Sequence, residues 1–169
     1  LDKDKLLVLA MHIPLFDEVD KKNFDAGHRA RLFALLAPFP HVLVLSAHSH
    51  NQRNYFHTDA DGWLGANPLH EFNLGAACGS YWSGVKDADG IPDARMDDGT
   101  PNGYAVLTVK PAGAYALAWH AARDPADTQI GLHVPKVLRR GAYPAWGVFA
   151  NYYMGDAASK LEFRVDGGT

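Results

Sequence analysis

Two apolar runs of strand length, each ending in histidine, constrain the fold of this chain more than any other feature. Residues 6–11 read Leu-Leu-Val-Leu-Ala-Met and lead into His12, and residues 42–47 read Val-Leu-Val-Leu-Ser-Ala and lead into His48 and His50. Continuous apolar runs of this length are typical of strands buried on both faces, which occur mainly in parallel sheets. The pattern predicts two buried strands that carry three imidazoles at their carboxyl ends.

The segment between these runs predicts a helix. Asp25 is placed to cap its first turn, and apolar residues recur at helical spacing as far as about Ala37. Pro38 and Pro40 then end it, because proline lacks the backbone N–H that a helix needs. A strand–helix–strand unit of this kind is expected to form a parallel pair of strands.

Two further strand patterns follow, at Arg53–Thr58 and Leu69–Leu74, separated by the turn sequence 59–62. They predict an antiparallel extension of the sheet. Residues 79–103 are rich in glycine and aspartate and predict a long loop. Loops of this length inside a compact domain usually have a function or mark a boundary.

Short strand patterns separated by turns fill the rest of the chain and are typical of a β-sandwich. We expect strands at Tyr104–Val109, Ala114–Ala121, Gln129–Val134, Trp146–Tyr152 and Lys160–Val165. The expected fold class is therefore α/β followed by all-β, with domains at residues 1–100 and 101–169. The chain starts directly before its first strand, and Asp166-Gly167 is a hairpin turn with no strand after it. Both ends therefore suggest a fragment.

Composition narrows the functions that are open to the chain. The 169 residues are 47% hydrophobic and carry a net charge of −3, so there is no basic field for nucleic acid or for an anionic membrane. No apolar stretch approaches the roughly 18 residues that cross a bilayer, and we expect a soluble protein. Cys78 is the sole cysteine, which excludes an internal disulfide and suits a small buried filler.

The three histidines predict half of a metal site. Imidazole is a good neutral ligand for Zn, Fe, Mn or Ni, and each of these metals takes about four to six donors. Sites in open α/β sheets gather at the carboxyl ends of strands, where His12, His48 and His50 are all expected. The other histidines are interpreted as surface or structural residues: His28, His41, His57, His70, His120 and His133.

With these residues the chain resembles the calcineurin-like metallophosphoesterase superfamily. Met11-His12 is similar to the family's isolated metal-binding histidine, and 47–50 to its Gly-His-x-His motif, with Ala47 in place of glycine. The resemblance implies that His12 and His48 bind one metal and His50 the other. Residues 79–84 and 98–104 further resemble a bacterial branch with an appended C-terminal β domain. The fold implied is half of an αββα sandwich followed by that β domain.

The resemblance also implies phosphoester hydrolysis by two metals, Mn, Fe, Zn or Ni, held roughly 3.5–4 Å apart around a bridging water. The resemblance implies that Asp-x-His, Gly-Asp and Gly-Asn-His motifs belong to the family's N-terminal half. We do not expect them here, because they would precede Leu1, and Asp2, Asp4, Asp17 and Asp20 stand in other sequence contexts. Each metal would therefore lack several donors, and incomplete sites bind weakly. We expect a fragment of a binuclear phosphoesterase that has little or no activity alone.

Several weaker candidates remain open. Tyr81 and Trp82 could stack on a substrate or pack against the β module, and Asn102 could contact substrate or occupy a turn with positive φ. Residues 87–98 superficially suggest a calcium loop, but their spacing departs from the EF-hand pattern. Ser46 and Ser49 lie near histidines without the Gly-x-Ser-x-Gly motif of a serine hydrolase.

Two rival interpretations concern partners. Residues 104–165 could act as a binding or structural module, which exposed aromatic residues on one face would favour. Alternatively, two chains could pair through uncovered sheet edges as a homodimer. The partner of the parent enzyme would be a small phosphoester substrate, and family habit implies a periplasmic or secreted location.

Overall fold

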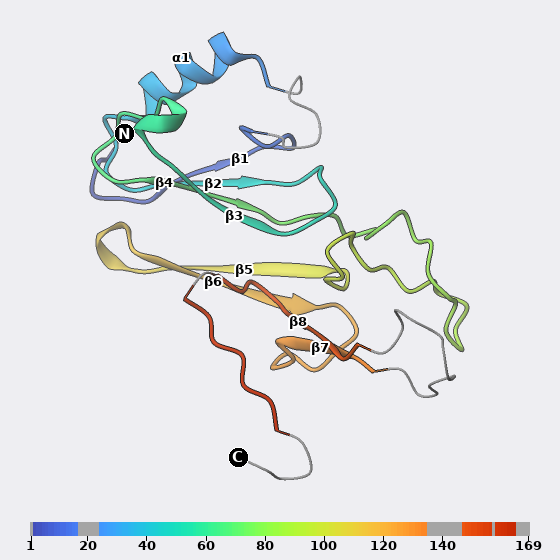
Figure 1. Ribbon diagram of the computed structural model, residues 1–169. Coiled ribbons are helices and arrows are strands. Elements are labelled where there is room, and N and C mark those ends of the chain that lie inside the picture. The colour runs from blue at the N-terminus through green and yellow to red at the C-terminus, as the bar shows by residue number, and fades with distance from the viewer. Residues whose placement is uncertain (1, 17–23, 135–146, 157, 165–169) are drawn as a thin grey trace.

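The computed structural model describes residues 2–16, 24–134, 147–156 and 158–164. In these residues the chain is mixed α/β with mainly strands (Figure 1). The elements of the first part are β1 Leu7–Ala10, α1 Ala26–Leu36, β2 Val42–Ser46, β3 Arg53–His57, the 3-10 turn η1 Asp59–Asp61 and β4 Leu69–Asn73. Those of the second part are β5 Gly103–Val109, the 3-10 turn η2 Pro111–Gly113, β6 Tyr115–Ala121, β7 Ile130–His133 and β8 Phe149–Tyr152.

The first four strands form one sheet in the order β1-β2-β4-β3. β1 and β4 both pair with β2 in parallel, and β3 pairs with β4 antiparallel. The parallel pair and the antiparallel extension are therefore confirmed. β4 lies between β2 and β3, so the strand that follows the η1 turn returns to the centre of the sheet.

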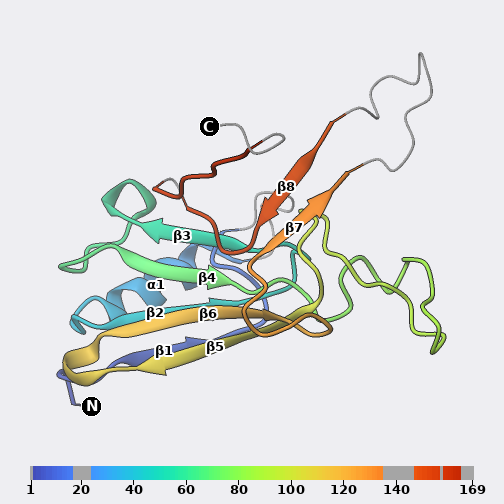
Figure 2. The same cartoon turned by 90° about the horizontal axis from the view of Figure 1, so that it is seen from below.

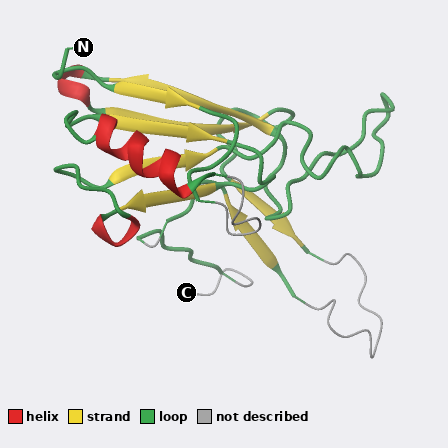
Figure 3. Cartoon of the chain, turned by 90° about the horizontal axis from the view of Figure 1, so that it is seen from above, coloured by secondary structure: helices red, strands yellow, loops and turns green. Residues whose placement is uncertain are grey.

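Helix α1 covers one face of this sheet (Figure 3). It begins where expected, because the Asp25 carboxylate accepts a hydrogen bond of 2.9 Å from the backbone N–H of His28. Phe33 and Leu36 are its buried residues. They pack with Val44 of β2 and Leu69 of β4 in the larger apolar core. Burial of this face, rather than helix propensity, holds a helix of 11 residues in place.

The β5–β6 hairpin lies against the opposite face of the sheet (Figures 1 and 2). By strand register and alternation, Leu43 and Phe72 share this face with His70, and both are fully buried. Tyr115 of β6 reaches the sheet through a hydrogen bond of 2.5 Å between its hydroxyl and Nδ1 of His70. The hairpin therefore packs as a layer against the face of the sheet that is opposite α1.

The remaining strands, β7 and β8, pair antiparallel as a separate two-stranded sheet. A second, smaller core of Met96, Trp119 and Tyr153 lies in this half. The described strands form no closed barrel, and the expected sandwich stays a prediction. The boundary at residue 101 stays a prediction.

One expected strand is wrong. Lys160–Arg164 is not a strand in the described residues, and Val165 lies outside them. Leu161 and Phe163 are 60% and 87% exposed, so the alternating pattern has no neighbouring strand or core to pack against. A strand needs both, because its backbone donors and acceptors are satisfied by a partner. The preceding strand begins at Phe149, and Trp146 also lies outside the described residues.

Residues 79–102 form the expected long loop, which extends beyond the carboxyl ends of β1, β2 and β4 (Figure 1). The loop folds back on itself through two isolated antiparallel β-bridges, one between Lys86 and Pro92 and one between Arg95 and Pro101. Ala94, Met96 and Thr100 are buried, so its second half returns to the core. In the described part of the chain, no helix has the length and apolarity to cross a membrane.

Candidate metal centre

The parallel pairing of β1 with β2 brings two of the three histidines together. Beyond the strands, the N–H of Met11 donates to the carbonyl of Leu45 at 2.9 Å, and the N–H of Ala47 donates to the carbonyl of His12 at 3.0 Å. These bonds extend the register to the residues that carry the imidazoles. His12 and His48 consequently leave neighbouring strands side by side, at the carboxyl edge of the sheet, and both are exposed.

The rings of His12 and His48 meet through their nitrogens. Nε2 of His12 lies 3.0 Å from Nδ1 of His48, with the ring centroids 4.9 Å apart and the planes at 75°. As a hydrogen bond, this contact requires one nitrogen to donate and the other to accept. The separation also fits a shared ion: two nitrogens each about 2.0–2.1 Å from one metal lie about 3 Å apart. The pair therefore has the chemistry and the spacing of two ligands to one ion.

His50 is oriented differently. Its Nδ1 lies 2.6 Å from the carbonyl oxygen of Gly79, and because a carbonyl only accepts, Nδ1 carries the proton. Nε2 is then the nitrogen with a free lone pair. Metal-binding histidines commonly donate their second N–H to a backbone carbonyl in this way, which fixes the ring and its tautomer. His50 is thus held in a form suited to bind a metal through Nε2.

Unusual backbone conformations gather at the expected site residues. In the described chain, six residues other than glycine have positive φ, and four of them are His48 (72°), His50 (51°), Tyr81 (58°) and Trp82 (57°). This left-handed region is uncommon for residues with a side chain, although histidine is enriched there. Such conformations cluster at functional sites, where the surrounding structure holds them in place.

Tyr81 lies beside His50, with the ring centroids 4.5 Å apart. It is 77% exposed, so it is not packed into the β module, and Trp82 is 45% exposed. Cys78 is half-buried rather than a fully buried filler. The rings of Tyr81 and Trp82 are therefore both accessible to a ligand at this edge of the sheet.

Asn102 differs from the expectation of a turn residue with positive φ, because it is not among the residues with positive φ. Its N–H donates to the carbonyl of Ala94 at 2.7 Å, and its carbonyl accepts from the N–H of Ala122 at 2.9 Å. Its backbone therefore connects the long loop to the end of β6. A contact between its side chain and a substrate stays a prediction.

Within the described residues, no group of three or more His, Cys, Asp or Glu side chains is placed to hold a metal ion. Within the long loop, the carboxylate of Asp87 is engaged by neighbouring groups. Asp87 accepts backbone N–H groups from Asp89 and Ile91 and pairs with Arg123 at 2.7 Å. The hydrogen bond from Ile91 is the main cause that lowers the pKa of Asp87.

Sequence reasoning missed a buried polar cluster beneath the histidines. Glu71 of β4 is fully buried and contacts Leu15, Ser46 and His57. A glutamate within a strand pattern ordinarily indicates an exposed position, so the sequence carried little signal for its burial. The structure places it against both segments that carry the paired histidines.

With this geometry established, comparison with protein families is informative. The family model described as the C terminal of Calcineurin-like phosphoesterase matches residues 71–169, more than half of the chain. The chain belongs to this calcineurin-like phosphoesterase family. Comparisons with curated proteins and with solved structures gave no match.

The match to the calcineurin-like phosphoesterase family begins at Glu71 in β4 and runs through the long loop into both β hairpins. It includes Tyr81, Trp82 and Asn102, whereas His12, His48 and His50 precede it. The match thus confirms the family resemblance. It contains residues 79–84 and 98–104, on which the resemblance partly rested, but it does not reach the histidine motifs. The family is metal-dependent, and the chain is a phosphoesterase-related protein.

Proposed function

We propose that this chain supplies three histidine ligands to the two-metal site of a phosphoester hydrolase. His12 Nε2 and His48 Nδ1 bind one ion, and His50 Nε2 binds the other. The observation that supports this most directly is the 3.0 Å separation of the two nitrogens, at the edge of the sheet where both rings are exposed. Membership of the calcineurin-like phosphoesterases supports the reaction class.

Each residue then has a definite task. A pair of bound divalent ions supplies the Lewis acidity that activates water and neutralises phosphate charge. The Gly79 carbonyl keeps the proton of His50 on Nδ1 and so keeps Nε2 available. Tyr81, beside His50 and largely exposed, faces the organic group of a phosphoester, and Trp82 widens this apolar surface.

The chain alone is proposed to be a poor catalyst. The paired histidines give one ion two donors and the other ion a single donor, whereas such ions take about four to six. Carboxylate donors from outside the described residues are needed to complete both spheres. With added Mn²⁺ or Zn²⁺ and a generic aryl phosphate we expect little or no turnover, and brisk metal-dependent hydrolysis would contradict this part of the proposal.

Binding of Zn²⁺ tests the ligands directly. We expect the wild-type chain to bind Zn²⁺ weakly in a calorimetric titration, with a stoichiometry that falls when either ring of the pair is removed. His12→Ala and His48→Ala should each lose the Zn²⁺ signal of the shared site. His133→Ala on β7, an exposed histidine outside the site, is the matched control and should bind as the wild type does. Equal loss in all three variants would point to non-specific binding.

An alternative is that the β strands form a binding module without catalysis. The exposed aromatic residues on β8 are Phe149 and Tyr152. Because their spacing is odd, they lie on opposite faces of that strand. These two residues therefore do not form one aromatic face on β8, and the family match supports the hydrolase more directly. A periplasmic or secreted location is part of the proposal and is supported by the resemblance alone.

Pairing of two chains is a further proposal about partners. β1 is an edge strand of the four-stranded sheet, and Val8 on it is 38% exposed. An unpaired edge with apolar side chains favours association through added strand pairing. Light scattering should then show a dimer, and a clean monomer at high concentration would exclude it.

A further inference from the structure

A buried carboxyl group lies beneath both segments that carry the paired histidines. Glu71 is 0% exposed and shares a face of the sheet with apolar core side chains such as Val44 and Leu69. Its Oε1 accepts hydrogen bonds from the backbone N–H of Leu15 at 3.0 Å and from the hydroxyl of Ser46 at 2.6 Å. Its Oε2 accepts from Nε2 of His57 at 2.7 Å.

The two contacts of Oε1 reach different strands. Leu15 lies three residues after His12, and Ser46 lies two residues before His48. A single oxygen atom of β4 therefore joins the segment after β1 to the end of β2, next to the two rings that meet at 3.0 Å. The contact of Oε2 goes instead to β3, which carries none of the site residues.

A second polar residue of β4 contacts the loop between His48 and His50 directly. Asn73 is also fully buried and lies on the same face of the strand as Glu71. Its Nδ2 donates to the hydroxyl of Ser49 at 2.7 Å, and Ser49 lies between His48 and His50. β4 is thus tied to the end of β2 through Glu71 and to the loop that follows β2 through Asn73.

Burial of a carboxyl group is costly unless hydrogen bonds satisfy it, and apolar residues often replace such groups without loss of stability. We propose that Glu71 is a positioning residue that holds the His12 and His48 segments together so that their ring nitrogens converge. The relevance of this convergence to metal binding rests on the proposed function.

Removal of Glu71 itself would leave three buried donors unpaired and risk unfolding the sheet, so its partners provide the better test. Ser46→Ala and His57→Phe each remove one hydrogen bond to the same carboxyl group, and phenylalanine preserves a ring at position 57. Of these two partners, Ser46 directly precedes the loop that carries His48 and His50, whereas His57 lies on β3. The two variants therefore separate positioning of the site from general support of the core.

Two readouts are needed: the ¹⁵N resonances of the His12 and His48 rings without metal, and the affinity for Zn²⁺. We expect Ser46→Ala to move both ring signals towards those of unpaired imidazoles and to weaken Zn²⁺ binding at least about tenfold, as for other residues that orient metal ligands. His57→Phe should leave both readouts unchanged while lowering stability to urea. Ser46→Thr, which keeps the hydroxyl, should restore both.

Equal effects of Ser46→Ala and His57→Phe on the ring signals, or no effect of either, would overturn the proposal. If His57→Phe does not fold, the contrast between Ser46→Ala and Ser46→Thr decides. Failure of the proposed function gives a different result. The wild type then binds no Zn²⁺, yet Ser46→Ala still moves the ¹⁵N signals of both rings towards those of unpaired imidazoles. If the wild type binds Zn²⁺ through His12 and Ser46→Ala binds it equally well, positioning by Glu71 is wrong and the metal site stands.

Discussion

At the scale of single residues, the loop at 47–50, which carries His48 and His50, has an unfavourable backbone conformation that places the two imidazole rings. His48 and His50 both adopt left-handed φ values, 72° and 51°, on either side of Ser49. For a residue with a Cβ this region costs roughly 1–2 kcal/mol. The hydrogen bonds of Ser49 with Asn73 and Asn51 hold the loop in this conformation. Glycine at positions 48 and 50 would make the folded protein more stable. The presence of histidine at both positions is therefore best explained by the chemistry of the imidazole ring.

This strain predicts an unusual order of stability among variants at position 48. Both His48→Gly and His48→Ala lose the contact with His12, but glycine adopts positive φ without a steric penalty. We expect His48→Gly to be more stable than His48→Ala by about 1 kcal/mol in urea unfolding. At Ala47, which does not have positive φ, the substitution Ala47→Gly should instead destabilise. The same order at both positions would contradict the argument.

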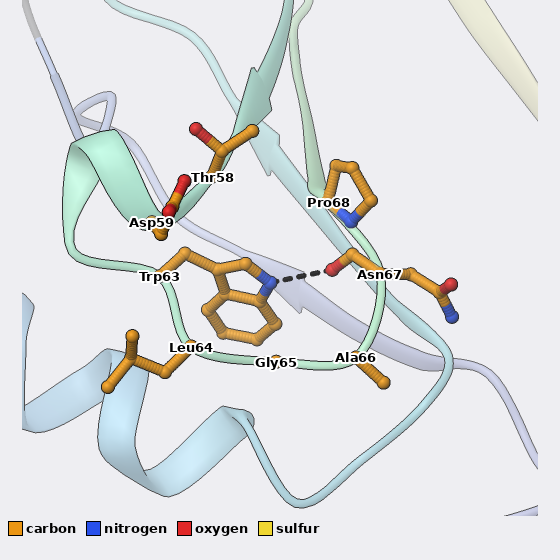
Figure 4. A pocket seen from close by; sticks show the side chains of 8 residues that line it. All are labelled: Thr58, Asp59, Trp63, Leu64, Gly65, Ala66, Asn67 and Pro68. Carbon is orange, nitrogen blue, oxygen red and sulfur yellow. Dashed lines mark hydrogen bonds between the residues drawn. The ribbon is translucent and has the colours of Figure 1, made fainter.

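At the scale of elements, the connection from η1 to β4 folds around one indole (Figure 4). Trp63 is 4% exposed and packs against Phe33 of α1, with ring centroids 5.5 Å apart. Its Nε1 donates to the carbonyl of Asn67 at 2.7 Å, which closes the loop over the ring. A Cβ on Gly65 would lie 2.3 Å from the Trp63 ring. The loop therefore needs glycine at this point for close packing.

This close approach predicts the effect of Gly65→Ala. Because the methyl group would overlap a buried ring, we expect the free energy of unfolding to fall by about 1–3 kcal/mol. Chemical unfolding followed by tryptophan fluorescence measures it. Ala66→Ser, at the exposed neighbouring position, is the control and should change little. If both variants unfold at the wild-type midpoint, the ring has room to move and the loop is less tightly packed than described.

At the scale of the whole molecule, one hydrogen-bonded chain attaches the β5–β6 hairpin to the sheet. His70 Nε2 donates to Oδ1 of Asn54 at 2.9 Å, so Nδ1 accepts from the hydroxyl of Tyr115. Burial lowers the pKa of His70, against an opposing effect of the Glu71 charge and with a further lowering by His57. Burial also raises the pKa of Tyr115. Both groups are therefore neutral in the folded protein at neutral pH.

The lowered pKa of His70 predicts a loss of stability in mild acid. As the pH falls through the ordinary histidine value of about 6.5, the unfolded chain binds a proton before the folded chain does, so the free energy of unfolding decreases. The decrease from this group ends once the pH is below the folded-state pKa. We expect the stability of wild type to fall more steeply between pH 7.5 and 5 than that of His70→Gln, measured by urea unfolding. Parallel pH profiles would show that His70 does not titrate differently on folding.

Local patterns in the sequence were sufficient to predict most of the helices and strands. The apolar runs at residues 6–11 and 42–47 and the capped helix after Asp25 depend on neighbours within one or two turns of chain, so periodicity predicted them. The family resemblance, which rested partly on the histidine motifs, also agreed with the match over residues 71–169. The pattern at Lys160–Val165 failed, because pairing depends on a distant partner that alternation does not reveal.

By itself, the sequence determined which segments become strands and which residue types stand at their ends. It did not show that β1 is an edge strand with Val8 and Ala10 exposed, so the expectation of burial on both faces is wrong for β1. Only the tertiary structure decided that Nε2 of His12 and Nδ1 of His48 lie 3.0 Å apart, that His50 donates to Gly79, and that Glu71 is buried beneath them. Strand propensity is set by neighbouring residues, whereas the placement of a ring depends on register, backbone conformation and hydrogen bonds between segments far apart in the chain.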